Sequence, residues 1–122
     1  MPKQPPKQRI ILVDDHEVVR AGLRLLLEDE DDFVMVGEAS DGAEAVRLTN
    51  ELQPQVVLMD LRMPGMGGLE AIEQIQVRWP DVAVVILTTY NEDELMVRGL
   101  RAGARGYLLK DTKRQTLFDT LK

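Results

Sequence analysis

Residues 9–15, Arg-Ile-Ile-Leu-Val-Asp-Asp, contain a short apolar run that ends in two aspartates. The apolar residues Ile10–Val13 leave no polar face, which is typical of a parallel strand buried on both sides. The two aspartates end that run, so the chain is expected to leave the sheet there. Segment 16–28 then has apolar residues at helical spacing, namely Val19, Leu23, Leu26 and Leu27. A buried strand followed by an amphipathic helix predicts the start of a β–α–β unit.

The same alternation continues along the chain. Further strands are predicted at 33–39, 56–59, 82–87 and 106–109, and further helices at 43–52, 68–79, 93–102 and from 115 onward. Buried strands that alternate with helices predict a parallel sheet with helices on both faces. Right-handed crossovers leave few topologies for such a chain. Five strands suit the flavodoxin-like doubly wound α/β sandwich, (βα)5, with strand order 2-1-3-4-5.

Length and composition restrict the function classes. A chain of 122 residues allows one domain with a substantial core. Its 15 Lys and Arg against 21 Asp and Glu give a net charge of −6, which disfavours binding to DNA, RNA or an anionic membrane by bulk electrostatics. The longest apolar run, 82–87, is far shorter than the ~20 residues of a membrane span. The absence of cysteine excludes disulfides, thiol nucleophiles and Cys-type zinc sites, and fits a cytoplasmic location.

The two ends of the chain differ from the segment between them. Residues 1–8 contain three prolines and no apolar periodicity, which predicts a disordered tail, although a cloning remnant would look the same. The folded domain is therefore expected over 9–122. The last helix only begins its apolar stripe before Lys122, so we expect a domain cut from a longer protein.

Polar residues follow the expected strands at their carboxyl ends. They are Asp14 and Asp15 after the first strand, Asp60 after the third, Thr88 after the fourth and Lys110 after the fifth. Ligands of doubly wound sheets bind beyond these strand ends. Three crowded carboxylates need a counter-charge, and Mg²⁺ fits because it takes one or two carboxylates and leaves positions for phosphate oxygens. A carboxylate beside such an ion can attack phosphorus and form an aspartyl phosphate.

Each of these residues also has an ordinary explanation. Asp14 and Asp15 could cap the following helix, with Glu17 completing a capping box. Asp60 could be a turn residue and Lys110 a solvated surface lysine. His16, the single histidine, is interpreted as a surface or packing residue. The convergence of several strand ends nevertheless favours a site.

Four motifs, taken in order, resemble the receiver domain of bacterial two-component response regulators. They are Val13-Asp-Asp-His16, Met59-Asp-Leu-Arg-Met-Pro-Gly65, Leu87-Thr-Thr89 and Gly106-Tyr-Leu-Leu-Lys-Asp111. The resemblance covers residues 9–122, and the MDLRMPGMGGLEA and AGARGYLLKD stretches are similar to the NarL/LuxR subfamily. One departure is Asp111, where many receivers have a proline after the lysine, so we expect a trans peptide bond there.

The resemblance implies a role for each residue of the site. Asp60 would accept the phosphoryl group, and Mg²⁺, or in its place Mn²⁺, would bind Asp15, Asp60 and the backbone carbonyl of Arg62, with Asp14 acting through water. Thr88 and Lys110 would bind phosphoryl oxygens, and Tyr107 would be the switch aromatic.

The resemblance also implies partners. These are a sensor histidine kinase, a helix-turn-helix DNA-binding domain that follows in the parent protein, and a second copy of the domain after phosphorylation. The fragment itself is expected to bind neither nucleic acid nor membrane, and to act as a signalling phosphoacceptor rather than as an enzyme.

Other classes fit the sequence less well. A haloacid dehalogenase-type phosphatase would carry an Asp-x-Asp pair after the first strand, and Asp14-Asp15 lacks that spacing. A degenerate receiver would lack the acceptor, the lysine or the acidic pair. A dinucleotide-binding fold would show Gly-x-Gly-x-x-Gly after the first strand. Segment 93–102 has four apolar residues, Leu95, Met96, Val97 and Leu100, of which some could face a partner or all could belong to a broad core face.

Overall fold

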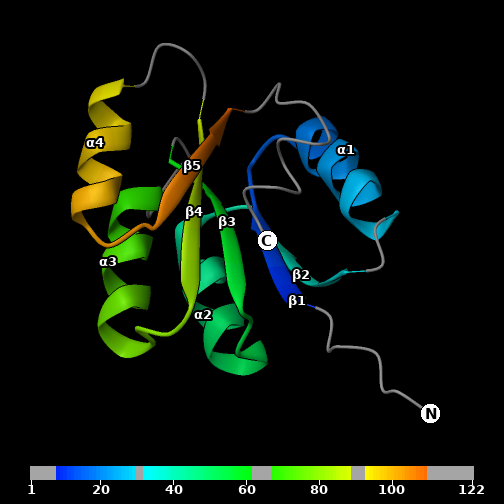
Figure 1. Cartoon of the computed structure of the whole chain (residues 1–122), viewed down its shortest axis with the longest axis horizontal. Helices are drawn as coiled ribbons and strands as arrows, with labels where there is room; N and C mark the ends of the chain where they lie inside the picture. The colour runs from blue at the N-terminus through cyan, green and yellow to red at the C-terminus, as the bar shows by residue number, and fades with distance from the viewer. Residues whose placement is uncertain (1–7, 30–31, 62–66, 89–92, 110–122) are drawn as a thin grey trace.

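The computed structural model describes residues 8–29, 32–61, 67–88 and 93–109. Within these ranges five parallel strands form one sheet in the order β2-β1-β3-β4-β5. Figure 1 shows the sheet between two layers of helix, with α1 on one side and α2, α3 and α4 on the other. The predicted flavodoxin-like topology is confirmed.

Strands and helices alternate through the described residues. The strands are β1 (Gln8–Val13), β2 (Phe33–Ala39), β3 (Val56–Asp60), β4 (Ala83–Thr88) and β5 (Gly106–Leu109). The helices are α1 (Glu17–Glu28), α2 (Gly42–Leu52), α3 (Gly68–Arg78) and α4 (Asp93–Arg101). The helix predicted from residue 115 onward lies outside the described residues.

Alternating side chains of the strands supply two separate cores. Ile10 and Leu12 pack with Leu23 and Leu27 of α1, as the helical stripe predicts. The intervening residues of the same strands pack on the opposite face, against α2 and α3. That second core includes Ile11, Val13, Val57, Met59, Ile72, Ile75 and Ile86. Burial on both faces explains why these strands are uniformly apolar in sequence.

The predicted element boundaries agree with the observed ones to within one residue. The first strand begins at Gln8 rather than Arg9, because the Gln8 amide donates to the carbonyl of Asp32 at 2.9 Å and Gln8 pairs with Phe33. Gln8 therefore belongs to the sheet and not to the tail expected over 1–8. Residues 1–7 lie outside the described residues.

Local sequence signals explain where two helices begin and end. The Asp41 side chain accepts a hydrogen bond from the Glu44 amide at 2.8 Å, which satisfies a free donor at the start of α2. Gly103 follows α4 with a φ of 123°, a value that L side chains rarely adopt. This glycine ends α4 and lets the chain turn toward β5.

Candidate functional site

The sheet register brings two acidic segments together. Val13 at the end of β1 pairs with Met59 of β3, so Asp14 and Asp60 are the next residues on neighbouring parallel strands. Since the carboxyl ends of parallel strands meet at one edge, residues 46 positions apart become neighbours. The predicted convergence of these two strand ends is confirmed.

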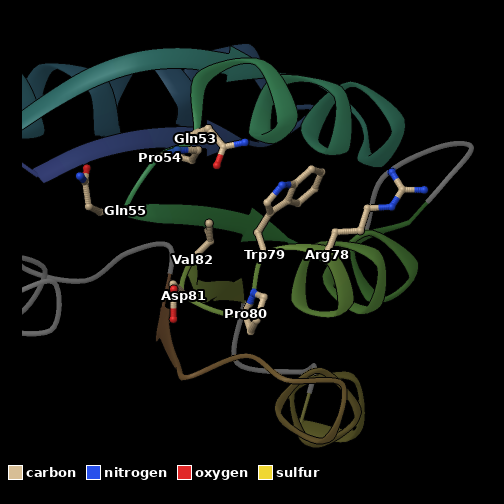
Figure 2. A pocket seen from close by; sticks show the side chains of 8 residues that line it. All are labelled: Gln53, Pro54, Gln55, Arg78, Trp79, Pro80, Asp81 and Val82. Atoms are coloured by element: carbon tan, nitrogen blue, oxygen red, sulfur yellow. The ribbon is translucent and has the colours of Figure 1, made fainter.

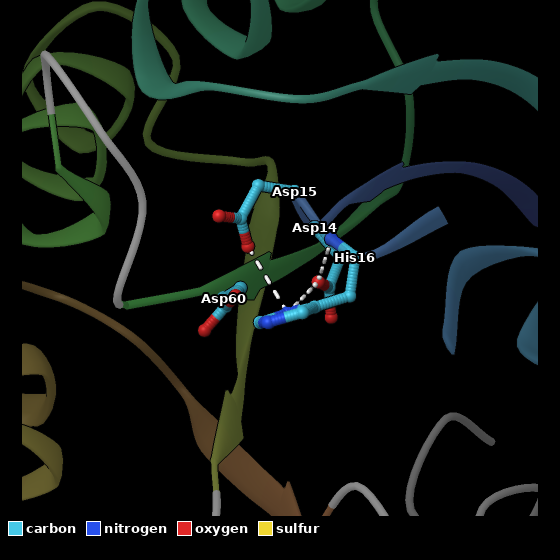
Figure 3. A group of neighbouring side chains, drawn as sticks. All are labelled: Asp14, Asp15, His16 and Asp60. Atoms are coloured by element: carbon cyan, nitrogen blue, oxygen red, sulfur yellow. Dashed lines mark hydrogen bonds and ion pairs between the residues drawn. The ribbon is translucent and has the colours of Figure 1, made fainter. Parts of the chain in front are cut away.

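Asp14, Asp15, His16 and Asp60 form one cluster, which we call the acidic cluster. Each offers one ligand atom, and these atoms lie within 4.8 Å of one another. Figure 3 shows the side chains of Asp15 and Asp60 near one another, with the His16 ring beside them. Asp14 is 0% exposed and Asp60 1%, whereas the Asp15 side chain keeps 29% exposure. Buried carboxylates this close together repel one another unless a positive charge compensates them.

His16 is a member of the cluster that the sequence analysis missed. Its Nδ1 lies 3.1 Å from Oδ1 of Asp14 and 3.1 Å from Oδ1 of Asp15. The ring itself is 62% exposed, so a surface residue was a reasonable expectation. The signal that could have indicated its place was its position directly after two site aspartates.

The capping explanation of the two aspartates is wrong. The N-cap of α1 is His16, with no side-chain hydrogen bond to the helix, so Glu17 is the first helical residue and not the third. Asp14 instead accepts from the His16 amide at 2.8 Å, which fixes the turn between β1 and α1. The acidic cluster is thus held by the turn that precedes the helix.

Gly68 allows α3 to begin against the strand that carries Asp60. A Cβ at Gly68 would lie 2.4 Å from the carbonyl oxygen of Asp60 and 2.7 Å from the Cα of Leu61. Both are backbone atoms, so no rotamer change could relieve the clash. The absence of a side chain at Gly68 therefore sets the position of the backbone at Asp60.

The other predicted site residues are placed only in part. Thr88 is the last residue of β4, and its backbone pairs with Leu109, the residue before Lys110. Tyr107 pairs with Ile86 on β4, and 49% of Tyr107 is exposed. Lys110 and Arg62 lie outside the described residues, as does Asp111. Asp60 pairs with Leu87 of β4, so Thr88, the next residue, lies at the same edge of the sheet as Asp60.

The acidic cluster is chemically suited to a hard cation. Its three carboxylates offer the oxygen donors that Mg²⁺ prefers, and the exposed Asp15 leaves the site open to solvent. Mg²⁺ retains several waters, which suits a site with few protein ligands. The imidazole of His16 is a poorer ligand for such an ion and is better suited to donate a hydrogen bond to the aspartates.

A separate hollow lies away from the acidic cluster. It has a volume of about 360 Å³ and is lined by Gln53–Gln55 and Arg78–Val82, before β3 and β4. Figure 2 shows the Trp79 ring between these two loops, with Arg78 beside it. It is at the amino ends of the strands, the opposite edge from the acidic cluster. The volume of this hollow therefore does not identify the functional site, whereas the clustered carboxylates at the carboxyl edge do indicate one.

Comparison with known proteins gives one consistent family. The model of the response regulator receiver domain matches residues 10–122. The chain is 56% identical over 113 residues to the transcriptional regulatory protein YdfI of Bacillus subtilis, covering 93% of this chain and 53% of that protein. It is 46% identical over 114 residues to LiaR of the same organism, covering 93% and 54%.

Solved structures agree. The receiver domain of the response regulator NarL from Mycobacterium tuberculosis matches with a TM-score of 0.90 at 33% identity, covering 96% of this chain and 94% of that one. A LuxR-family response regulator from Aurantimonas matches with a TM-score of 0.87 at 37% identity, covering 95% and 83%.

The chain belongs to the response regulator receiver family, as the sequence motifs predicted. Receiver domains of this family are signalling phosphoacceptors, and the curated relatives are named as transcriptional regulatory proteins. The chain spans about half the length of the curated relatives that it matches. In the part of the chain that the structure describes, every helix is too short or too polar to cross a membrane.

Proposed function

We propose that Asp60 is the residue that receives the phosphoryl group and that Mg²⁺ binds beside it. The observation that carries the proposal is the burial of Asp60 next to Asp14 and Asp15. One carboxylate oxygen from each of the three residues lies within 4.8 Å of the others. A carboxylate held in a cluster of like charges is activated for phosphoryl chemistry once a cation compensates them.

The reaction divides among the residues as follows. An oxygen of Asp60 attacks phosphorus, and the bond from phosphorus to the donor nitrogen of a kinase histidine, or to the oxygen of acetyl phosphate, breaks. Asp15, Asp60 and the carbonyl of Arg62 would hold the metal directly, and Asp14 would hold it through water. Bound Mg²⁺ supplies charge neutralisation on the transferring oxygens. Asp14 and His16 keep the first acidic segment in place through their mutual hydrogen bond.

Thr88, Lys110 and Tyr107 complete the proposed switch. Thr88 and Lys110 would contact the phosphoryl oxygens, which are strong hydrogen-bond acceptors. Tyr107 is half exposed, and in the proposed switch it would turn inward beside β4 when Thr88 engages the phosphoryl group. Val97 and Leu100 of α4 are exposed and give an apolar surface that a second copy of the domain could cover.

The switch has a direct test in the oligomeric state. Thr88→Ala should still accept a phosphoryl group but respond weakly to it. Sedimentation with and without beryllofluoride, a phosphoryl mimic, should show dimerisation of the wild type and less of the variant. Equal dimerisation of both would remove Thr88 from the coupling.

The partners follow from the family and belong to the parent protein. A sensor histidine kinase would donate the phosphoryl group, and a helix-turn-helix domain after residue 122 would receive the signal. The net charge of −6 supports an output through that second domain rather than through contact of this domain with DNA. We place the protein in the cytoplasm, where such kinases present their phosphohistidine, and treat residues 1–7 as a tail outside the domain.

Labelling tests the acceptor assignment. Incubation with acetyl phosphate and Mg²⁺ should add the mass of one phosphoryl group to the intact protein, and the modification should be labile in base and to hydroxylamine. Asp60→Asn should show no added mass, while Asp41→Asn, an acidic residue at the start of α2, serves as the matched control. Labelling of Asp60→Asn at wild-type yield would sink the assignment.

A further inference from the structure

Arg20 of α1 is bound to the backbone of the acidic cluster. Its Nη1 donates to the carbonyl oxygen of Asp14 at 2.6 Å. Its Nε lies 3.3 Å from an Oε1 of Glu38 on β2. The Arg20 side chain is only 21% exposed, so these contacts are partly sheltered from water. One guanidinium therefore connects the end of β1 to the neighbouring strand.

Glu38 holds this guanidinium with the help of a second arginine. Arg24, one helical turn after Arg20, donates from Nη1 to an Oε2 of Glu38 at 2.8 Å. That hydrogen bond, together with the charge of Glu38, raises the pKa of Arg24 above its usual range. Arg20 and Arg24 thus share the Glu38 carboxylate. Among the described residues, Arg20 is the one of the two that also donates to the carbonyl of Asp14.

The carbonyl that Arg20 binds belongs to the peptide unit that joins Asp14 to Asp15. This unit is planar, so a hydrogen bond to its oxygen restricts the orientation of both flanking residues. Asp14 is fixed on its other side by its amide, which donates to the carbonyl of Ala39 at 3.1 Å. Arg20 therefore acts on the segment where the sheet ends and the two aspartates must point toward Asp60.

We propose that Arg20 is a positioning residue for the metal site, which it serves by holding the Asp14–Asp15 peptide unit. This inference rests on the proposed role of the acidic cluster in binding Mg²⁺. Residues that orient metal ligands change metal affinity by roughly 10- to 100-fold when they are replaced. Because Arg20 acts on the backbone rather than on a carboxylate, we expect an effect near the lower limit.

The charge of Arg20 would act in the opposite direction. A cation near the site disfavours Mg²⁺, so loss of charge alone would tighten binding. Glu38 compensates that charge at 3.3 Å, and the contact with Asp14 is therefore the larger effect. Arg24 is the matched control, since it carries the same charge on the same helix and pairs with the same carboxylate.

The experiment is titration calorimetry of the whole chain with MgCl₂ alone, on the wild type and four variants. Arg20→Gln should weaken Mg²⁺ affinity about tenfold, and Arg24→Gln should stay within about twofold of the wild type. Arg20→Lys should restore only part of the affinity, because a single ammonium cannot use two separate nitrogens as the guanidinium does. Glu38→Gln should fall between Arg24→Gln and Arg20→Gln, since it leaves the Arg20 contact with Asp14 but weakens its anchor.

Two further measurements make the result decisive. Saturating Mg²⁺ should return the acetyl phosphate labelling rate of Arg20→Gln toward that of the wild type, because the acceptor itself is intact. Urea unfolding should show similar losses of stability for Arg20→Gln and Arg24→Gln, so that only metal affinity separates them. Equal Mg²⁺ affinities of these two variants would overturn the proposal.

A reference variant keeps this inference separate from the proposed function. Asp15→Asn should lose Mg²⁺ binding if the acidic cluster is the metal site. Unchanged affinity of Asp15→Asn would overturn the metal site, and with it the role of Arg20. Loss in Asp15→Asn with none in Arg20→Gln would overturn the role of Arg20 alone.

Discussion

The two edges of the sheet differ in what they do with polar groups. At the amino edge, polar side chains bind backbone atoms and close the loops: the Arg9 amide donates to Oε1 of Gln55 at 2.6 Å, and Gln76 Nε2 donates to the carbonyl of Val82 at 2.9 Å. At the carboxyl edge, carboxylates face one another within 4.8 Å. The amino edge closes its loops with hydrogen bonds, whereas the carboxyl edge brings like charges together, and a bound cation would reduce their repulsion.

This contrast explains why the hollow beside Trp79 is the poorer site candidate. The hollow beside Trp79 is bordered by a loop in which Oε1 of Gln55 and the carbonyl of Gln53 already accept hydrogen bonds from Arg9. The acidic cluster holds three like charges, two of them on buried residues. Repulsion of this kind lowers stability and is retained where it serves binding or chemistry.

The largest expected difference between the edges is in phosphoryl transfer. Asp15→Ala should slow labelling by acetyl phosphate on the order of 100-fold or more, because it removes an oxygen ligand of the metal. Asp81→Ala, at the amino edge, removes the same chemical group and should label at the wild-type rate. The measurement is the rate of appearance of the phosphorylated mass at fixed Mg²⁺. Similar rates for the two variants would erase the functional distinction between the edges.

The next prediction compares alanine substitutions of two glycines, one at each edge, in their effects on the free energy of unfolding and on the labelling rate. Gly68→Ala forces a Cβ onto the backbone of Asp60 at the carboxyl edge, and Gly103→Ala imposes a strained φ of 123° at the amino edge. Each should cost about 2–3 kcal/mol in the free energy of unfolding. Only Gly68→Ala should also slow labelling in the fraction that stays folded, because it displaces Asp60.

Urea unfolding and labelling of the same samples check this prediction. Gly22→Ala is the control, since a Cβ at Gly22 meets no atom within 4 Å and alanine favours a helix by ~1 kcal/mol. Slow labelling of fully folded Gly103→Ala would contradict the prediction that only the glycine at the carboxyl edge affects phosphoryl transfer.

The smallest expected effect is on stability and its response to metal. Asp14→Asn keeps an oxygen for the His16 amide but removes one of the three like charges, so it should raise metal-free stability by about 1 kcal/mol. In the wild type, Mg²⁺ at tenfold its Kd should add about 1.4 kcal/mol. Asp14→Asn should gain less from the metal. Thermal unfolding with and without MgCl₂ measures both changes, and lower metal-free stability of Asp14→Asn would show that the repulsion is already compensated within the protein.

The sequence by itself determined the architecture, because its signals are local. The apolar runs of β1 and β3 specify strands buried on both faces, and helical spacing of residues such as Leu23 and Leu27 specifies the helix that covers one of them. Right-handed crossovers left few strand orders, and five strands suited the order 2-1-3-4-5. Strand ends also showed where Asp14, Asp15 and Asp60 would meet, and the motifs identified the family.

Only the tertiary structure decided how the members of the site differ from one another. Asp14 and Asp15 are adjacent in sequence, yet one is buried and the other exposed, because burial depends on the neighbouring strands and not on the residue type. His16 joined the acidic cluster, and Arg20 reached the Asp14 carbonyl, through contacts between segments whose orientation no periodicity encodes. Side-chain direction at a strand end depends on the turn that follows, and that turn forms only when the helix packs against the sheet.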